Sequence, residues 1–198
     1  HGYRADIDYT HGYYAELNPL RMRYALLNAG FVAPDVTHAC ELGYGQGISV
    51  NLHAAASNVA WWGTDFNPSQ ASFAQSLSTA SGAQAQLADQ GFEHYCHRTD
   101  LPDFDYIGIH GIWSWVSDAH RNVMVDFIRR KLKVGGVLYI SYNTQPGWAG
   151  FAPMRHLMAE HAERMGAAGL GYESRVNGAL DFMERMLGAN PAYARAIP

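Results

Sequence analysis

The sequence predicts an α/β fold, an open and mostly parallel sheet with helices on both faces. Apolar runs typical of strands alternate with segments of helical character. The runs lie at residues 38–40, 58–64, 104–110 and 137–142, and the helical segments at 48–56, 68–77 and 118–132. Such alternation is typical of parallel strands joined by helical crossovers. A glycine-rich segment, ELGYGQG at residues 41–47, follows the first run and predicts a nucleotide-cofactor loop.

Residues 1–35 form a lead-in before the sheet. They carry Tyr3, Tyr9, Tyr13 and Tyr14, followed by a helix predicted over residues 20–30. Asn18 is its expected cap, and Pro19 stands in its first turn. Most of these tyrosines are expected to pack structurally, and Tyr14 is also a candidate for the floor of a ligand cleft.

The sheet has one weak strand and no evident closing strands. Residues 84–88, which lead to Asp89, are rich in Ala and Gln, which are poor strand formers. Gly135 and Gly136 are expected to stop the helix over 118–132. Beyond residue 148 the pattern predicts only helices, at 153–165 and 180–187. We therefore expect a lead-in (1–35), an α/β domain (36–148) that lacks antiparallel edge strands, and a helical extension (149–198).

Composition limits the class of protein. With 198 residues, of which 48% are hydrophobic, the chain can bury one sizeable core. A net charge of −4 argues against a general nucleic-acid binder, and the basic residues at 129–133 fit a solvated helix end. Two cysteines form no disulfide framework, and the sequence contains neither a leader pattern nor a membrane-length apolar run, so the cytoplasm is expected. Because residue 1 is His, the ends are not taken as natural ends, and nothing indicates the oligomeric state.

The glycine spacing narrows the choice of cofactor. A dinucleotide site needs a third glycine where this chain has Ile48, whereas the closer spacing suits a ligand without a pyrophosphate, such as S-adenosylmethionine. Acidic residues at other strand ends converge on the same cleft: Asp65 is suited to the ribose hydroxyls and Asp89 to the adenine amino group. The full set of candidate cofactor residues is Glu41, Gly43, Tyr44, Gly45, Gly47, Asp65, Phe66, Asp89 and His110. A nicotinamide site stays open on spacing alone.

Successive motifs resemble those of class I S-adenosylmethionine-dependent methyltransferases, which have a Rossmann-like sheet. They lie at residues 41–47, 63–65, 104–107 and 132–137. The segments HGIWSWV at 110–116 and SYNTQPGW at 141–148 further resemble the bacterial group with a methyltransferase regulatory domain, which includes rickettsial protein-lysine methyltransferases. Tyr44 stands where that group often has Cys. The resemblance implies methyl transfer to an acceptor, with protein lysine as one candidate.

The candidate residues on the acceptor side of the cleft are one histidine and several aromatic residues. His110 follows a strand and is a candidate general base, with a structural histidine as the alternative. The candidate pocket residues are Tyr14, Trp113, Trp115, Tyr142 and Trp148, which are otherwise core or lid residues. The nearby set His94, Cys96, His97 and Asp100 matches no zinc spacing, so no metal is expected.

The sequence therefore predicts an S-adenosylmethionine-dependent methyltransferase that acts on a nitrogen or oxygen nucleophile. The acceptor is a protein lysine by resemblance, or a small molecule or saccharide. Two other classes stay open: an NAD-linked oxidoreductase, and a cofactor-binding module without turnover.

Overall fold

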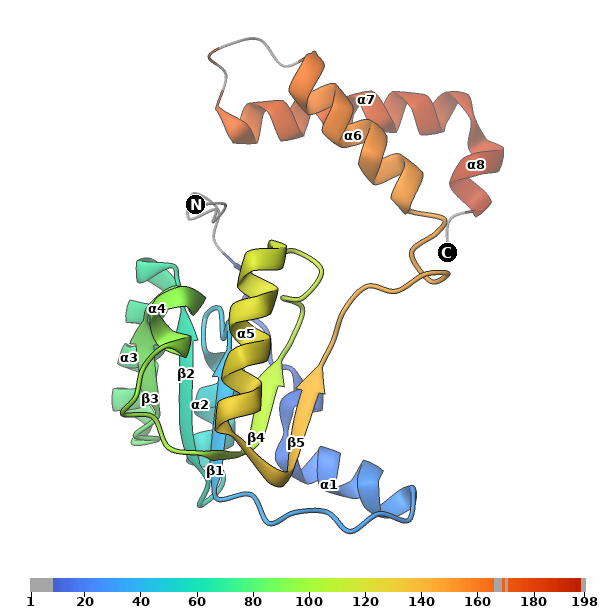
Figure 1. Cartoon of the computed structure of the whole chain (residues 1–198). Coiled ribbons are helices and arrows are strands. Elements are labelled where there is room, and N and C mark those ends of the chain that lie inside the picture. The colour runs from blue at the N-terminus through green and yellow to red at the C-terminus, as the bar shows by residue number, and fades with distance from the viewer. Residues whose placement is uncertain (1–8, 166–168, 170, 197–198) are drawn as a thin grey trace. The chain divides into compact units, whose positions relative to one another are not determined.

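A computed structural model describes residues 9–165, 169 and 171–196 (Figure 1). The chain divides into two compact units, His1–Tyr142 and Asn143–Pro198. Tyr3 of the lead-in lies outside the described residues.

The first unit contains a five-stranded, wholly parallel sheet, as predicted. Its strands are β1 (His38–Leu42), β2 (Ala60–Asp65), β3 (Gln86–Asp89), β4 (Phe104–Ile109) and β5 (Leu132–Ile140). Their spatial order is β3-β2-β1-β4-β5, so the chain moves outward from β1 in one direction and returns to its other side at β4. The weak third strand is confirmed. Its Ala and Gln side chains have a low strand propensity, and backbone pairing with β2 stabilises the extended conformation instead.

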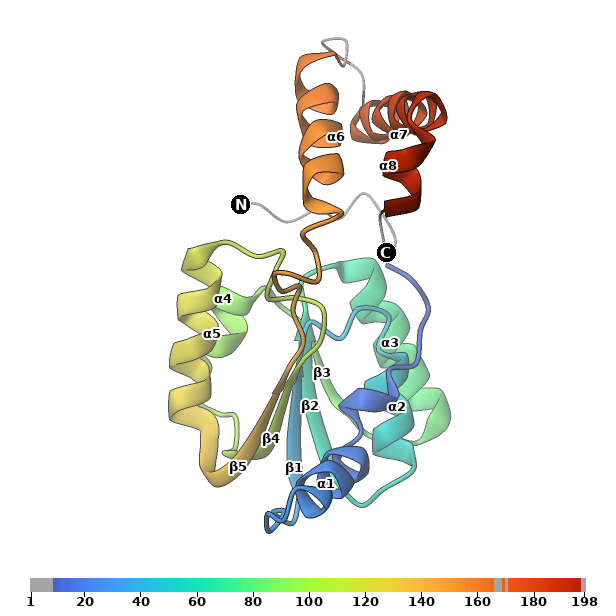
Figure 2. The same cartoon turned by 90° about the vertical axis from the view of Figure 1, so that its right-hand side faces the viewer.

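Helices cover both faces of this sheet. They are α1 (Pro19–Asn28), α2 (Ile48–Ala55), α3 (Pro68–Ser81), α4 (Phe92–Cys96) and α5 (Asp118–Lys131), with a short 3₁₀ helix, η1 (Ala15–Leu17), before α1. Figure 2 shows α4 and α5 on one face and α2 and α3 on the other. The expected cap of α1 is confirmed, since Oδ1 of Asn18 accepts from Leu20 N at 2.9 Å; Asn67 caps α3 in the same way, and its Oδ1 accepts from Ser69 N at 3.0 Å. The patterns for η1 and α4 are too short to read from sequence.

Alternate residues of the central strands supply two separate cores. On β1, Cys40 and Leu42 pack toward α4 and α5, whereas Ala39 packs toward α2 and α3. Tyr106 of β4 belongs to the second cluster, and Ile107 to the first. This period of two, with both faces buried, holds the ends of β1 and β4 at fixed positions.

The expected helix stop at Gly135 and Gly136 is wrong. The helix α5 ends at Lys131, and β5 begins at once with Leu132 in an extended conformation. A Cβ on Gly136 would lie 2.9 Å from Lys133 O and 3.0 Å from Asp105 O, at a register shift between β4 and β5. Gly136 therefore allows a close strand approach, whereas Gly135 supplies a left-handed backbone with φ of 84°. In the described part of the chain β5 ends the sheet, and no antiparallel strand follows.

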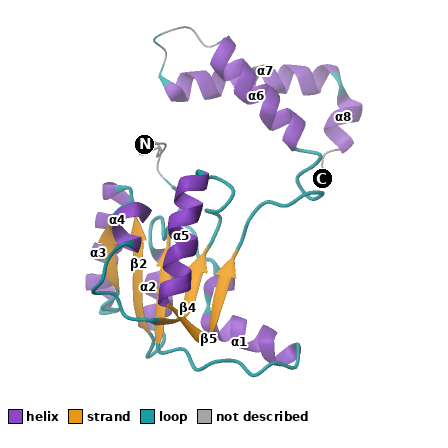
Figure 3. Ribbon diagram, viewed as in Figure 1, coloured by secondary structure: helices purple, strands orange, loops and turns teal. Residues whose placement is uncertain are grey.

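The second unit is helical, as Figure 3 shows. It contains α6 (Ala152–Arg164), α7 (Tyr172–Ala189) and α8 (Pro191–Ala196). The helix α7 starts eight residues before the predicted 180, because Gly178 is accommodated within it. His161 and Phe182 stack with ring centroids 4.6 Å apart and join α6 to α7.

Candidate functional site

The candidate site lies at the carboxyl ends of β1, β2 and β4. The chain order reverses between β1 and β4, and in open parallel sheets ligands bind outside the strand ends at such a point. The glycine loop leaves β1 there and leads into α2. The first turn of α2 therefore offers unpaired N–H groups beside the loop.

The loop depends on backbone conformations that suit glycine. Gly43, Gly45 and Gly47 have φ of 79°, 56° and 70°. A Cβ on Gly47 would lie 2.5 Å from Cβ of Ala74, so this position also permits α2 and α3 to pack closely. The N–H of Gly47 donates to Tyr44 O at 2.9 Å and closes the turn.

Asp65, at the end of β2, braces this loop. Its carboxylate accepts from Gly45 N at 2.9 Å and from Asn67 N at 3.0 Å, and the backbone N–H of Phe66 is a third donor to it. Burial raises the pKa of Asp65, and these backbone N–H donors partly oppose the rise. A carboxylate has about four acceptor sites, so three backbone donors still leave capacity to accept from a ligand hydroxyl.

The neighbouring candidates line the same edge. Asp89 is exposed and stands opposite Asp65 in the register of β2 and β3, and Phe66 is half-buried just beyond β2. Tyr44 is buried, and its hydroxyl donates to Ala88 O at 2.9 Å, which ties the loop to β3. The structure thus brings these sequence-predicted residues together.

Glu41 is a buried carboxyl group, and one of its oxygens makes no hydrogen bond to the described residues. Its side chain ends β1 only 3% exposed, and Oε2 has no hydrogen-bond partner among the described residues. Burial, with a smaller contribution from Asp65, raises the pKa of Glu41 to about 8. An orphaned carboxyl oxygen beside a glycine loop is a group that a polar ligand would satisfy.

The lead-in covers the glycine loop. The sequence predicts that the tyrosines of the lead-in pack structurally, but not that they contact this loop. The ring of Tyr9 lies against Gly45, where a Cβ would be 2.8 Å from it, and Nε2 of Gln46 donates to Tyr9 O at 3.2 Å. Burial raises the pKa of Tyr9, with a further contribution from Tyr14. The backbone N–H of Tyr14 donates to Ser49 Oγ at 2.8 Å, so residues 9–17 are fastened to the start of α2.

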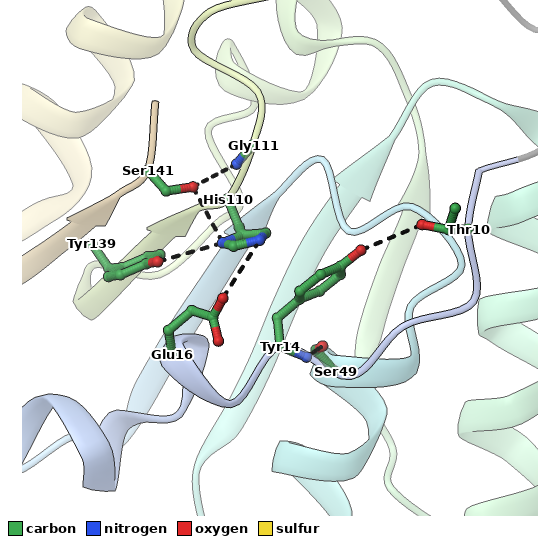
Figure 4. Close-up of polar contacts among 8 residues, drawn as sticks. All are labelled: Thr10, Tyr14, Glu16, Ser49, His110, Gly111, Tyr139 and Ser141. Atoms are coloured by element: carbon green, nitrogen blue, oxygen red, sulfur yellow. Dashed lines mark hydrogen bonds and ion pairs between the residues drawn. The ribbon is translucent and has the colours of Figure 1, made fainter. Parts of the chain in front are cut away.

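His110, just beyond β4, stands at the centre of a polar network (Figure 4). Its Nδ1 lies 3.2 Å from Ser141 Oγ and 3.4 Å from Tyr139 OH, and its Nε2 lies 3.8 Å from Oε1 of Glu16. Burial lowers the pKa of His110, and the nearby carboxylate of Glu16 opposes this. Sequence reasoning missed Glu16, Tyr139 and Ser141, because nothing in their local pattern connects η1 and β5 to His110.

Among the predicted pocket residues, Tyr14 directly contacts His110, with ring centroids 4.4 Å apart. Trp113 packs on the core cluster under α5, where the Arg121 guanidinium lies 5.8 Å from its ring. Trp115 and Tyr142 are more than half exposed. Trp148 belongs to the second unit, where its ring packs edge-on against Phe151 at 5.0 Å.

In the described part of the chain, no group of three or more His, Cys, Asp or Glu side chains is placed to hold a metal ion. Within the set singled out from sequence, Nδ1 of His97 bonds Glu93 O, and Asp100 pairs with Arg98. No helix of the described ranges combines the length and the apolar character that crossing a membrane needs.

Relatives by sequence match the chain over much of its length. No family model matches. An uncharacterized protein of Synechocystis, sll1526, is 40% identical over 202 residues, which cover all of this chain and 39% of that protein. An uncharacterized protein of Rickettsia prowazekii, RP789, is 33% identical over 79% of this chain and 29% of its own length. The chain thus spans less than half of either relative.

The solved structure of PKMT2 from Rickettsia typhi, in complex with AdoHcy, is similar in three dimensions. It superposes with a TM-score of 0.71 at 22% sequence identity, over 91% of this chain and 35% of that one. In this chain the superposed part includes the wholly parallel sheet, whose strand order reverses between β1 and β4. The chain therefore has the fold of the class I S-adenosylmethionine-dependent methyltransferases and resembles rickettsial PKMT2 in that fold.

Proposed function

We propose that this chain is the cofactor-binding part of an S-adenosylmethionine-dependent methyltransferase that acts on a nitrogen or oxygen nucleophile. One observation carries the proposal: the glycine loop and Glu41 lie where the strand order reverses, and Asp65 and Asp89 end the next two strands at the same edge of the sheet. The AdoHcy complex of PKMT2 supports the choice of cofactor, because AdoHcy is the product left when S-adenosylmethionine gives up its methyl group.

The residues present fit that cofactor. The backbone of the loop and the start of α2 would hold its amino-acid end, and the orphaned Oε2 of Glu41 is a further acceptor there. Asp65 would take the ribose hydroxyls with its remaining lone pairs, and Asp89 the adenine amino group. Tyr44 and Phe66 would shape the wall of this site, with His110 on the side of the acceptor.

The bound cofactor supplies a methyl group on a sulfonium, which is a good leaving group. The protein therefore has to align the acceptor, exclude water and manage one proton. His110 and Glu16 are the titratable pair at that side of the cleft. The aromatic candidates Trp113, Trp115 and Tyr142 would contribute to acceptor binding through their π faces. We further propose protein lysine as the acceptor, ahead of a small molecule or saccharide.

A binding module without turnover is the second candidate. The observation that favours it is the edge strand β5, which has no outer partner in the described residues, in a chain that spans 39% of its Synechocystis relative. Transfer of labelled methyl from S-adenosylmethionine into poly-L-lysine or a cell extract distinguishes the two. Cofactor binding with no transfer into any fraction would favour the module.

Isothermal titration calorimetry tests the cofactor. We expect the chain to bind S-adenosylhomocysteine more tightly than NAD, and Asp65→Ala to weaken that binding by about 10- to 100-fold through lost ribose contacts. Asp35→Ala is the matched control, since that carboxylate is 90% exposed and lies before β1. Tighter binding of NAD, or unchanged affinity in a folded Asp65→Ala variant, would refute the assignment.

A further inference from the structure

The 3₁₀ helix η1 brings a carboxylate to the acceptor side of the cleft. Glu16 lies in η1, and its Oε1 is 3.8 Å from Nε2 of His110. The histidine side chain is 19% exposed and the glutamate 41%, so the carboxylate faces His110 on one side and is open on the other (Figure 4). The glutamate is therefore the more accessible member of the pair.

The hydrogen bonds around His110 assign its proton. The N–H of Gly111 donates to Ser141 Oγ at 2.8 Å, so the Ser141 hydroxyl turns its own proton to one of two neighbours, Nδ1 of His110 at 3.2 Å or the hydroxyl oxygen of Tyr139. Tyr139 OH offers a second donor to the same nitrogen at 3.4 Å. A lone pair on Nε2 would face the Glu16 carboxylate and be repelled. This arrangement favours the neutral tautomer of His110 that carries its proton on Nε2, directed toward Glu16.

This tautomer determines which atom of the pair can act as a base. Neutral His110 has its one lone pair turned to Ser141 and away from Glu16. The basic atoms that remain open are the oxygens of Glu16. We propose that Glu16 binds the ammonium form of an amine acceptor and takes the proton that the amine must lose, while His110 is the positioning residue that holds the carboxylate.

The surroundings of Glu16 favour a cation. The ring of Tyr14 lies 4.4 Å from that of His110, and Tyr139 stacks on the other side at 6.1 Å. Glu16 itself is close enough to Tyr139 to raise the pKa of that tyrosine, so an ammonium group held by the carboxylate would also lie near this ring, which favours a cation–π contact. Arg21 of α1 also acts electrostatically on Tyr139.

The step balances with the groups named. An ammonium acceptor gives one proton to Glu16 and becomes a neutral amine. The nitrogen lone pair then forms the new C–N bond as the methyl–sulfur bond breaks, and the sulfur keeps the bonding electron pair. The methylated nitrogen carries the positive charge, and Glu16 passes its proton to water. This inference rests on the proposed function, so its tests separate the two.

The first test measures binding without turnover. With the chain saturated by S-adenosylhomocysteine, n-butylammonium is titrated and the ring nitrogens of His110 are followed by ¹⁵N NMR. We expect butylammonium to shift these signals and 1-butanol to leave them unchanged. In Glu16→Gln the apparent Kd should rise at least about fivefold. Glu93→Gln is the matched control, because Glu93 is exposed on α4, on the far face of the sheet.

The second test measures methyl transfer to poly-L-lysine against pH. Glu16→Gln should lower kcat/KM by about 100-fold near neutral pH, as expected for a lost proton acceptor. The loss should shrink at alkaline pH, where the acceptor is already deprotonated in solution. A purely structural role would give a loss that does not depend on pH.

The outcomes are distinct. Failure to bind S-adenosylhomocysteine would overturn the proposed function. Normal cofactor binding with no effect of Glu16→Gln on butylammonium affinity or on the pH profile would overturn only the role of Glu16. The same NMR spectra check the tautomer: a protonated Nδ1 in the neutral ring would contradict the assignment, and Ser141→Ala should increase the Nδ1–H population.

Discussion

At the scale of single residues, the glycine loop illustrates how a backbone requirement differs from a packing requirement. Gly47 and Gly82 have nearly the same backbone, with φ of 70° and 68°. A Cβ on Gly47 would meet Cβ of Ala74 at 2.5 Å, whereas a Cβ on Gly82 would meet nothing within 4 Å. The pair therefore separates the cost of a left-handed conformation from the cost of a clash.

We predict that Gly82→Ala lowers the free energy of unfolding by about 1 kcal/mol, the cost of a left-handed conformation for a residue with a Cβ. Gly47→Ala should cost about 2 kcal/mol more, because α2 must move away from α3, and it should also weaken binding of S-adenosylhomocysteine. Urea denaturation and calorimetry measure both quantities. Equal losses in the two variants would show that the contact with Ala74 is unimportant.

The two sides of the cleft differ in how far single residues of the sequence predict them. The donor side of the cleft follows from sequence, since Glu41, Asp65 and Asp89 all occur where a predicted strand ends. The acceptor side does not, because Glu16 and Ser141 meet His110 only through tertiary packing of η1 and β5. Tyr9 was recognised merely as an aromatic residue, and its contact with Gly45 depends on the path of the lead-in.

At the scale of elements, one carboxylate joins three strands at the opposite end of the sheet. Asp105 of β4 accepts from Thr37 N at 2.9 Å, Thr37 Oγ1 at 2.8 Å and His38 N at 3.0 Å, and from Lys133 Nζ at 2.8 Å. Burial alone would raise the pKa of Asp105, but these donors hold it well below its usual range. The entrance to β1 and the start of β5 are thus fixed to β4.

We predict that Asp105→Ala destabilises the chain by about 2 to 3 kcal/mol, since several donors lose a charged acceptor. Because the folded pKa is depressed, this stabilisation is present above the unfolded pKa and is lost as the pH falls through the folded value. Thermal unfolding at pH 7 and at pH 3 should therefore show a smaller difference between the variant and the parent at pH 3. A difference that does not change with pH would contradict this account.

Element prediction succeeded where the pattern was long and failed where it was local. The strands over residues 38–42 and 104–109 and the helix α5 follow from apolar periodicity. The end of α5 agrees with the prediction to one residue, but the glycines at 135 and 136 lie within β5 and do not stop the helix, because glycine suits a helix stop and a strand irregularity equally well. Pairing with β4 decided between them, and pairing is not a local property of the sequence.

At the scale of the whole molecule, two buried groups give opposite dependences of stability on pH. Burial lowers the pKa of His53 from 6.5 to about 4, so its contribution to stability falls as the pH drops from 6.5 toward 4. The raised pKa of Glu41, from 4.5 to about 8, means that its contribution falls as the pH rises over that interval. Between pH 4.5 and 6.5, the contribution of His53 to stability rises with pH while that of Glu41 falls, so the two partly cancel. Above pH 6.5 only the contribution of Glu41 still changes.

We predict that the stability of the ligand-free chain decreases from pH 6.5 to pH 8, and that Glu41→Gln removes this decrease. The reason is that the unfolded chain releases the Glu41 proton in this range while the folded chain keeps it. Urea denaturation at several pH values measures the slope, and Glu93→Gln serves as the exposed control. A parent slope that Glu41→Gln leaves intact would assign it to other groups.

The protonated Glu41 at the end of β1 also concerns the cofactor. Near neutral pH it makes the folded chain one unit less negative than its formal net charge of −4. A ligand whose cationic end bonds to the orphaned Oε2 would favour the ionised carboxylate and expel that proton into the buffer. Affinity for such a ligand would then strengthen with rising pH as the bare fold weakens, so that proton release and site occupancy become one linked equilibrium.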